Sequence, residues 1–168
     1  MIKIFTDGST KIKNKKGFSN KGGFGYVVYQ DNIIIDAFSK QVENTTNNEM
    51  ELTALITAIE KYGTSETWDC PIIYSDSMYA INCLTLWGQT WKNNQWKKSN
   101  NQTIENLELV KKGISLLDSG NYNVEIQYCK GHNGIEGNEL ADKLATREIT
   151  VEEILYNKKG ENNEKTNL

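Results

Sequence analysis

Cysteine, proline and histidine are scarce in this chain of 168 residues, which has three cysteines, one proline and one histidine. Cys70, Cys83 and Cys129 are odd in number and lack metal-ligand or redox spacing, so we expect reduced thiols that mostly act as small core side chains. No apolar run approaches the ~20 residues of a membrane helix, and the first residues show no signal-peptide pattern. These absences predict a cytoplasmic protein with no membrane partner.

Several catalytic signatures are also absent. The sequence has no phosphate-binding glycine loop ending in Gly-Lys-Ser or Gly-Lys-Thr, no Gly-x-Ser-x-Gly elbow and no Cys/His zinc cluster. Hydrophobic residues make up 38% and charged residues 24%, which is typical of a globular domain. The net charge of -3 argues only weakly against a nucleic-acid partner, because local clusters of charge decide such binding.

The spacing of apolar residues predicts an α/β fold, with a mixed five-stranded sheet of three antiparallel and then two parallel strands, flanked by helices. Alternating or β-branched runs predict strands at residues 2–7, 24–30, 33–39, 71–75 and 124–128. Helical periodicity predicts helices at residues 46–62, 78–86, 104–117 and 138–145. The first helix begins with a capping box, in which Thr46 caps and Glu49 reaches back.

Acidic residues end two of the predicted strands. Asp7 follows the first strand and Asp76 follows the fourth, and a small residue follows each of them. If these strands are neighbours, both carboxylates lie at the carboxyl edge of the sheet, where α/β proteins place their sites. On local grounds alone, Asp7 is equally well explained as a turn residue that accepts hydrogen bonds near Gly8.

Two further acids lie on predicted helices. Glu51 lies at the edge of an apolar stripe, where a buried carboxylate is costly unless a cation meets it. A glutamate that faces solvent is the alternative. Asp142 follows Asn138 by one turn on the last helix, and the only histidine, His132, lies in the glycine-rich loop before that helix.

The four acids repel one another if they share a site. They are Asp7, Glu51, Asp76 and Asp142. They are therefore either dispersed or hold hard cations, since carboxylate oxygens are the ligands that magnesium and manganese prefer. Paired metals of this kind suit the cleavage of a phosphodiester, and no other chemistry is as well supplied by this sequence.

Tryptophans and lysines are interleaved in a hydrophilic segment that is poorly suited to a core. Its members are Trp87, Trp91, Lys92, Trp96, Lys97 and Lys98. Such a segment suits a nucleic-acid surface, where rings pack on sugar or base and ammonium groups neutralise phosphate. A satellite cluster that stabilises a surface projection is a compatible alternative. The lysine-rich loop at residues 11–21 is either a second phosphate contact or a solvated hairpin tip.

Five motifs in order resemble the signatures of the bacterial-type (type one) ribonuclease H family. They are Phe5-Thr6-Asp7-Gly8-Ser9, Thr45-Thr46-Asn47-Asn48 through Met50-Glu51-Leu52, Tyr74-Ser75-Asp76-Ser77, Lys130-Gly131-His132 and Asn138-Glu139-Leu140-Ala141-Asp142. The chain departs from the family pattern at two places. The lysine-rich loop replaces a Gly-Asn-Pro-Gly loop, and Glu49 stands where the family often has a basic residue.

The resemblance implies an endonuclease with a ribonuclease H-like fold, which uses two Mg²⁺ ions, or Mn²⁺ in their place, to hydrolyse the RNA strand of RNA–DNA hybrids. The products would carry 5′-phosphate and 3′-hydroxyl ends. The implied metal ligands are Asp7, Glu51, Asp76 and Asp142, and His132 would assist proton transfer or product departure. The residues implied or expected to contact the hybrid are Gly8, Ser9, Thr46, Asn47, Asn48, Trp87, Trp91, Lys92, Trp96, Lys97 and Lys98.

The predicted organisation is a catalytic domain at residues 1–150 and a polar, disordered tail at residues 151–168, in a monomeric protein. Two alternatives to the hybrid nuclease remain at this point. One is a nuclease of the same fold that cuts or joins DNA, and the other is a module that binds hybrids without cleaving them.

Overall fold

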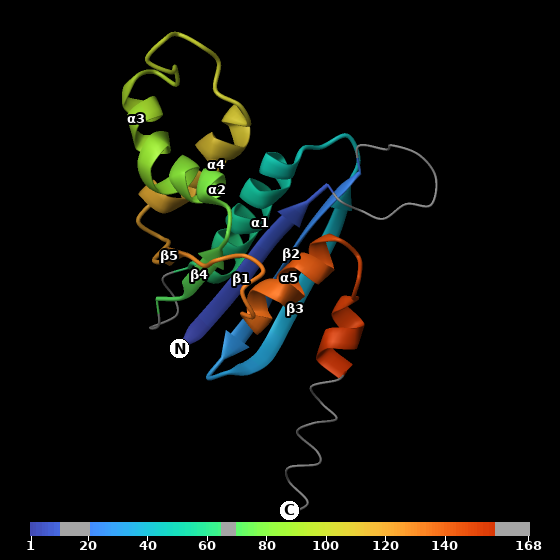
Figure 1. Ribbon diagram of the computed structural model, residues 1–168. Helices are drawn as coiled ribbons and strands as arrows, with labels where there is room; N and C mark the ends of the chain where they lie inside the picture. Colours follow the sequence, from blue (N-terminus) through green and yellow to red (C-terminus); the bar gives the residue numbers. More distant parts are fainter. Residues whose placement is uncertain (11–20, 65–69, 157–168) are drawn as a thin grey trace, which may run out of the picture.

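The strand order of the central sheet places the first and fourth strands side by side. The computed structural model describes residues 1–10, 21–64 and 70–156. Its strands are β1 (Ile2–Ser9), β2 (Gly22–Gln30), β3 (Ile33–Val42), β4 (Ile72–Ser75) and β5 (Glu125–Tyr128). They form one sheet in the order β3-β2-β1-β4-β5, with antiparallel pairing from β3 to β1 and parallel pairing from β1 to β5 (Figure 1). The predicted fold class is therefore confirmed.

Helices cover both faces of this sheet. They are α1 (Asn47–Tyr62), α2 (Met78–Asn82), the π-helical η1 (Cys83–Trp87), α3 (Gly88–Asn93), α4 (Leu107–Asp118) and α5 (Glu136–Ala145). α1 packs on one face of β1 and β2, whereas α5 packs on the opposite face (Figure 1). Among the residues that the structure describes, no helix is both long and apolar enough to cross a membrane.

The side chains of β2 show why the sheet needs both helical layers. Tyr26 and Val28 belong to the main core cluster with α1, whereas Val27 and Tyr29 belong to a second cluster with Leu144 of α5. Successive side chains of a strand point to opposite faces, so a strand that is buried on both faces has a continuous apolar pattern. β2 accordingly packs against both helical layers, α1 on one face of the sheet and α5 on the other.

Residues 151–156 add a short helical segment to the second cluster. Ile154 is only 3% exposed, and Val151 and Leu155 pack beside it. We expected a polar tail from residue 151, but the apolar side chains at 151, 154 and 155 share one helical face and pack on the domain. Residues 157–168 lie outside the described part of the chain.

The segment from Trp87 to Lys98 is more buried than its hydrophilic composition suggested. The helix expected at residues 78–86 continues through η1 and α3 to Asn93. Trp87, Trp91 and Trp96 are half-buried and pack against the main core. The expectation that this segment is poorly suited to a core is therefore corrected, because each indole buries its apolar body even where its surroundings are polar.

The lysine-rich loop lies almost entirely outside the described residues. Of its five lysines, the structure describes only Lys21, whose ammonium lies 3.3 Å from the carboxylate of Glu43. Two of the cysteines are placed as expected, since Cys83 and Cys129 are buried free thiols, whereas Cys70 is exposed.

Candidate active site

Parallel pairing of β1 with β4 brings two of the predicted acids together. Thr6 of β1 is paired with Ser75, the last residue of β4, so the next residues, Asp7 within β1 and Asp76 just after β4, lie side by side at the carboxyl end of β4. Thr6 and Ser75 are fully buried, and the Thr6 hydroxyl donates to the carbonyl of Tyr74 at 3.1 Å. The sheet therefore fixes the spacing of the two aspartates.

Close packing of Gly8 against α1 adds Glu51 to this pair. A Cβ at Gly8 would lie 2.2 Å from the backbone nitrogen of Glu51, so only glycine allows the strand to pass so near the helix. Thr46 caps that helix, because its hydroxyl accepts a hydrogen bond from the Glu49 nitrogen at 3.2 Å. The Glu49 carboxylate reaches back to accept from the Thr45 hydroxyl at 2.8 Å. The first turn of α1 is thereby held over the tip of β1.

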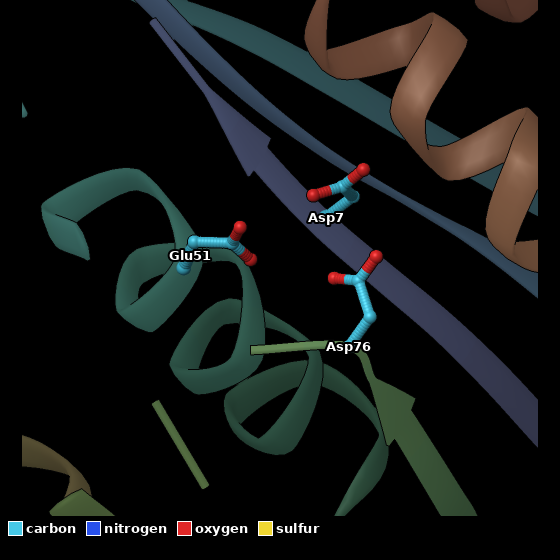
Figure 2. A group of neighbouring side chains, drawn as sticks. All are labelled: Asp7, Glu51 and Asp76. Carbon is cyan, nitrogen blue, oxygen red and sulfur yellow. The ribbon is translucent and has the colours of Figure 1, made fainter. Parts of the chain in front are cut away.

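The three acids point toward one another from β1, α1 and the end of β4 (Figure 2). Asp7 and Glu51 are 6% and 8% exposed, so the solvent-facing alternative for Glu51 is wrong. Each carboxylate accepts a hydrogen bond from a described residue: Asp7 from the Gly8 nitrogen at 2.7 Å, Glu51 from the Asn47 amide at 3.5 Å, and Asp76 from the Asn138 amide at 3.3 Å.

One oxygen of this cluster lacks the partner that a buried polar atom needs. Oε2 of Glu51 is buried and has no hydrogen-bond partner among the described residues. Buried polar atoms are almost always hydrogen-bonded or bound to an ion, because burial without a partner is costly. This oxygen indicates that the cluster is built for a ligand that the protein itself does not supply.

The electrostatics of the cluster point the same way. Burial, followed by the charges of Glu51, Asp76 and Asp142, raises the pKa of Asp7 well above its usual range. Burial and the charge of Asp76 also raise the pKa of Glu51. Among the described residues, the charged neighbours that shift both pKa values are all carboxylates, so none of these residues supplies a cation to the ionised forms.

The geometry of the cluster fits a divalent metal. Asp7, Glu51 and Asp76 each offer one oxygen, and these oxygens lie within 4.8 Å of one another. Oxygens on opposite sides of one Mg²⁺ are about 4 Å apart, so small side-chain rotations would place all three on one ion. The set of hard oxygen donors also suits Mg²⁺ or Mn²⁺ rather than a softer metal.

Asp142 and His132 lie at the same cleft, which has a volume of about 270 Å³. Asp142 comes from α5, and His132 comes from the loop between β5 and α5, where it has a positive φ of 50° and an exposed side chain. Gly131 beside it is needed for space, since a Cβ there would lie 2.4 Å from Oδ2 of Asp76. All five predicted catalytic residues therefore line one cleft.

Several predicted contact residues also line this cleft, and some lining residues were not predicted. Gly8, Ser9 and Asn47 line it, whereas Thr46 and Asn48 are exposed at the start of α1. Thr146 and Glu148 line the cleft without having been predicted, and Asn138 contacts Asp76. The spacing of Asn138 one turn before Asp142 was the available signal for its position, but helical spacing does not reveal a hydrogen bond across to β4.

The tryptophan and lysine segment forms a second hollow, of about 740 Å³. Trp87, Trp91, Lys97 and Lys98 line it together with Tyr79 and Asn100. Lys92 and Trp96 border a different hollow, where the Lys92 ammonium lies 2.6 Å from Asp118 and the Lys111 ammonium lies over the Trp96 ring. We refer to the segment from Trp87 to Lys98 as the projection. Its six predicted residues therefore lie on two different surfaces.

Comparison with known proteins identifies the class to which this fold and acidic cleft belong. The family model described as RNase H matches residues 1–150. The "Ribonuclease H" of Dichelobacter nodosus (strain VCS1703A) is 37% identical over 155 residues, which cover 89% of this chain and 92% of the relative. The chain therefore belongs to the ribonuclease H family.

Solved structures agree with this assignment. The solution structure of the PFV RNase H domain matches with a TM-score of 0.73 and 28% identity, over 87% of this chain and 92% of that one. The crystal structure of LC9-RNase H1, described as a type 1 RNase H with the type 2 active-site motif, matches with a TM-score of 0.70 and 28% identity, over 87% of this chain and 70% of that one. The predicted ribonuclease H-like fold is confirmed.

Proposed function

We propose that this protein is an endonuclease that hydrolyses the RNA strand of RNA–DNA hybrids with two Mg²⁺ ions, leaving 5′-phosphate and 3′-hydroxyl ends. The observation that carries the proposal is the buried cluster of Asp7, Glu51 and Asp76, whose oxygens lie within 4.8 Å of one another and have no neutralising cation among the residues that the structure describes. Membership of the ribonuclease H family supplies the substrate class.

The proposed metal ligands are the three clustered acids and Asp142. Held by these residues, divalent metals would supply charge that polarises the phosphate and would lower the pKa of an attacking water molecule. The chain's own part is to hold the carboxylates rigidly: the β1–β4 pairing fixes Asp7 and Asp76, and the capped first turn of α1 fixes Glu51. Asp142 adds a fourth carboxylate from α5, the helix on the face of the sheet opposite to α1.

His132 is proposed to move a proton at the leaving 3′ oxygen or to assist product departure. Its side chain is exposed at the rim of the cleft, so it reaches substrate without displacing the buried acids. Histidine is the side chain that most often transfers protons in enzyme active sites, which suits this role.

The proposed hybrid-binding surface extends from the cleft to the projection. Gly8, Ser9, Thr46, Asn47 and Asn48 would contact the backbone near the scissile phosphate, and Trp87, Trp91, Lys97 and Lys98 would bind the strand that enters the larger hollow. Trp96 and Lys92 are proposed to contribute less, because the Lys92 charge is already countered by Asp118. Aromatic rings and ammonium groups in one hollow suit stacking and phosphate neutralisation.

The deciding experiment offers labelled RNA–DNA hybrid, duplex RNA, duplex DNA and single-stranded RNA to the protein with Mg²⁺, with Mn²⁺ and with EDTA. We expect cleavage of the hybrid alone, only with metal, and products that a 5′-phosphate-dependent exonuclease degrades. Cleavage of duplex DNA would support the DNA nuclease of the same fold. Metal-dependent binding of the hybrid without cleavage would support a binding module.

We further propose that the protein acts as a monomer in the cytoplasm. One chain supplies all five proposed catalytic residues, and its three cysteines are free thiols, as in a reducing compartment. Size-exclusion chromatography with light scattering tests the first part, and a mass near 19.1 kDa is expected. Microscopy of a tagged full-length chain tests the second.

A further inference from the structure

A buried thiol is connected to the acid cluster through one side chain. Cys129, directly after β5, is 6% exposed, and Asn138, in the first turn of α5, is 2% exposed. The Cys129 thiol donates to Oδ1 of Asn138 at 3.3 Å, and Nδ2 of Asn138 donates to Oδ2 of Asp76 at 3.3 Å. The three residues therefore form one directed chain of hydrogen bonds that ends on a proposed metal ligand.

The fold places Cys129, Asn138 and Asp76 close together through further contacts. The Cys129 backbone nitrogen donates to the Ser75 carbonyl at 3.0 Å, which joins Cys129 to the residue before Asp76. Asn138 follows Gly137, which packs directly on the Phe5 ring, where a Cβ would lie only 2.2 Å from a ring carbon. The thiol, the amide and the carboxylate thus come from three segments that backbone hydrogen bonding and close packing bring together.

The direction of the hydrogen bonds matters because the two ends of an asparagine amide have nearly the same shape but opposite roles. With the amide reversed, Oδ1 would face the Asp76 carboxylate, and two acceptors would repel each other. The thiol donor on one side and the carboxylate acceptor on the other both select the same orientation. Burial first, and then the charges of Asp76 and Asp7, raise the pKa of Cys129 to about 11, so the thiol keeps the proton that it donates.

We propose that Cys129 and Asn138 are positioning residues, in which the thiol orients the Asn138 amide and the amide holds the Asp76 carboxylate in the position required for divalent metal binding. This inference rests on the proposed function, because it assigns the pair a role toward the metal of that same cleft. Partners that orient metal ligands typically change metal affinity or activity by about 10- to 100-fold when they are removed.

The test measures Mn²⁺ binding by titration calorimetry on the full-length, EDTA-stripped protein without nucleic acid, together with its thermal midpoint in EDTA. Asn138→Leu removes the amide at similar volume, and we expect about 10- to 100-fold weaker Mn²⁺ binding. Cys129→Val removes the thiol donor, and we expect about two- to fivefold weaker binding, as for loss of a weak hydrogen bond. Cys129→Ser keeps a donor and is expected to bind Mn²⁺ within about twofold of wild type.

A double variant separates positioning from packing. If Cys129 acts through Asn138, then Cys129→Val has no further effect on Mn²⁺ binding once Asn138→Leu is present, whereas independent packing effects would add. Cys83→Val is the matched control, since Cys83 is also a buried thiol but belongs to the main core cluster. We expect it to change the thermal midpoint without changing Mn²⁺ affinity.

The possible results separate this inference from the proposed function. Equal Mn²⁺ affinities for the Val and Ser variants of Cys129, or additive effects in the double variant, overturn the positioning role while wild type still binds Mn²⁺ and cleaves hybrid. A wild-type protein that neither binds Mn²⁺ nor cleaves hybrid overturns both proposals together. If Asn138→Leu does not fold, the Cys129→Val and Cys129→Ser pair decides the question by itself.

Discussion

Carboxylates lie at both ends of α1, and their surroundings are opposite in charge. At the last turn, Asp36 of β3 accepts hydrogen bonds from the Lys61 ammonium at 2.7 Å and from the Tyr62 hydroxyl. Burial alone would raise the pKa of Asp36, but the hydrogen bonds from Lys61 and Tyr62 outweigh it and lower the pKa. At the first turn, Glu51 meets Asp7 and other carboxylates, and both pKa values are raised.

This difference separates an acid whose charge is satisfied by the fold from acids whose charge is not. The chain supplies a cation and a hydroxyl to Asp36, so the charge of that acid is satisfied by folding alone. To the three clustered acids, the described residues supply amide donors and further negative charge, and they leave Oε2 of Glu51 without a partner. Strongly perturbed carboxyls in a cleft are typical of functional sites, because selection for stability alone would neutralise them.

The largest expected effect comes from exchanging one carboxyl for an amide at each end of α1. Asp7→Asn should lower kcat for hybrid cleavage by at least about 10³-fold, since several kcal/mol of metal-dependent stabilisation is lost. Asp36→Asn should keep activity within about twofold but lower the free energy of unfolding by about 1–2 kcal/mol, a value discounted because Lys61 is half exposed. Single-turnover kinetics and urea unfolding measure the two effects. Similar activity losses in both variants would remove the distinction between the two ends.

A second, smaller effect tests whether catalysis in the cleft uses a proton-transfer group in addition to the proposed metals. His132→Ala should slow turnover by about 10²–10³-fold without eliminating it, because general acid–base assistance contributes about that much. The folded state should be unaffected, since the side chain is exposed. Circular dichroism and the pH profile of kcat measure these outcomes. Complete inactivity of a folded variant would make His132 a ligand instead of a proton-transfer group.

The third prediction concerns pH, because the carboxyl pKa values are raised at the first turn of α1 and lowered at its last turn. The raised pKa values of Asp7 and Glu51 mean that the metal-free folded state binds protons more tightly than the unfolded state. Their contribution to stability is full below the unfolded pKa, near 4, and is lost as the pH rises through the raised values. In EDTA, we therefore expect the free energy of unfolding to fall by about 1–3 kcal/mol from pH 5 to pH 8 relative to Asp7→Asn.

Two controls sharpen this pH measurement. Saturating Mg²⁺ should restore stability most at the alkaline end, because the metal binds the ionised carboxylates of the folded state. Asp36 has the opposite sign, since its lowered pKa contributes stability above its unfolded value that is lost as the pH falls. Asp36→Asn should therefore leave the alkaline decline unchanged. A decline that persists undiminished in Asp7→Asn would assign it to groups other than Asp7.

The sequence predicts the positions of the acids better than it predicts their surroundings. Asp7 and Asp76 were predictable because strands 2–7 and 71–75 have clear apolar patterns, and parallel pairing places their ends together. The burial of Glu51 was predictable only as one of two alternatives, because its position at the edge of an apolar stripe does not specify what packs over it. The close approach of Gly8 to α1 decides that question, and it depends on tertiary packing.

Contacts between distant segments were beyond reach of sequence patterns. Helical spacing places Asn138 beside Asp142, but the hydrogen bonds of Asn138 to Asp76 and Cys129 depend on how α5 meets the ends of β4 and β5. In the same way, composition predicted exposed rings for Trp87 and Trp96, whereas the core beneath the projection buries part of each. Propensity and periodicity describe one element at a time, so contacts between elements were the part that they could not predict.

The smallest expected effect extends the comparison from paired and unpaired acids to the lysines of the projection. Lys97 and Lys98 line the larger hollow beside Trp87 and Trp91, whereas Lys112 is paired with Glu60 at 2.8 Å on a different surface. Each phosphate contact releases about one counterion, so the double variant Lys97→Ala and Lys98→Ala should reduce the slope of log affinity against log salt by about two and raise KM a few-fold, with little change in kcat. Lys112→Ala should leave the slope unchanged, because its charge is already countered within the protein.

Fluorescence anisotropy with a labelled hybrid and a catalytically inactive Asp7→Asn background measures the slope between low and physiological salt. If the lysine pair and Lys112 change the slope equally, only the net charge of the protein matters, and the projection does not hold the substrate.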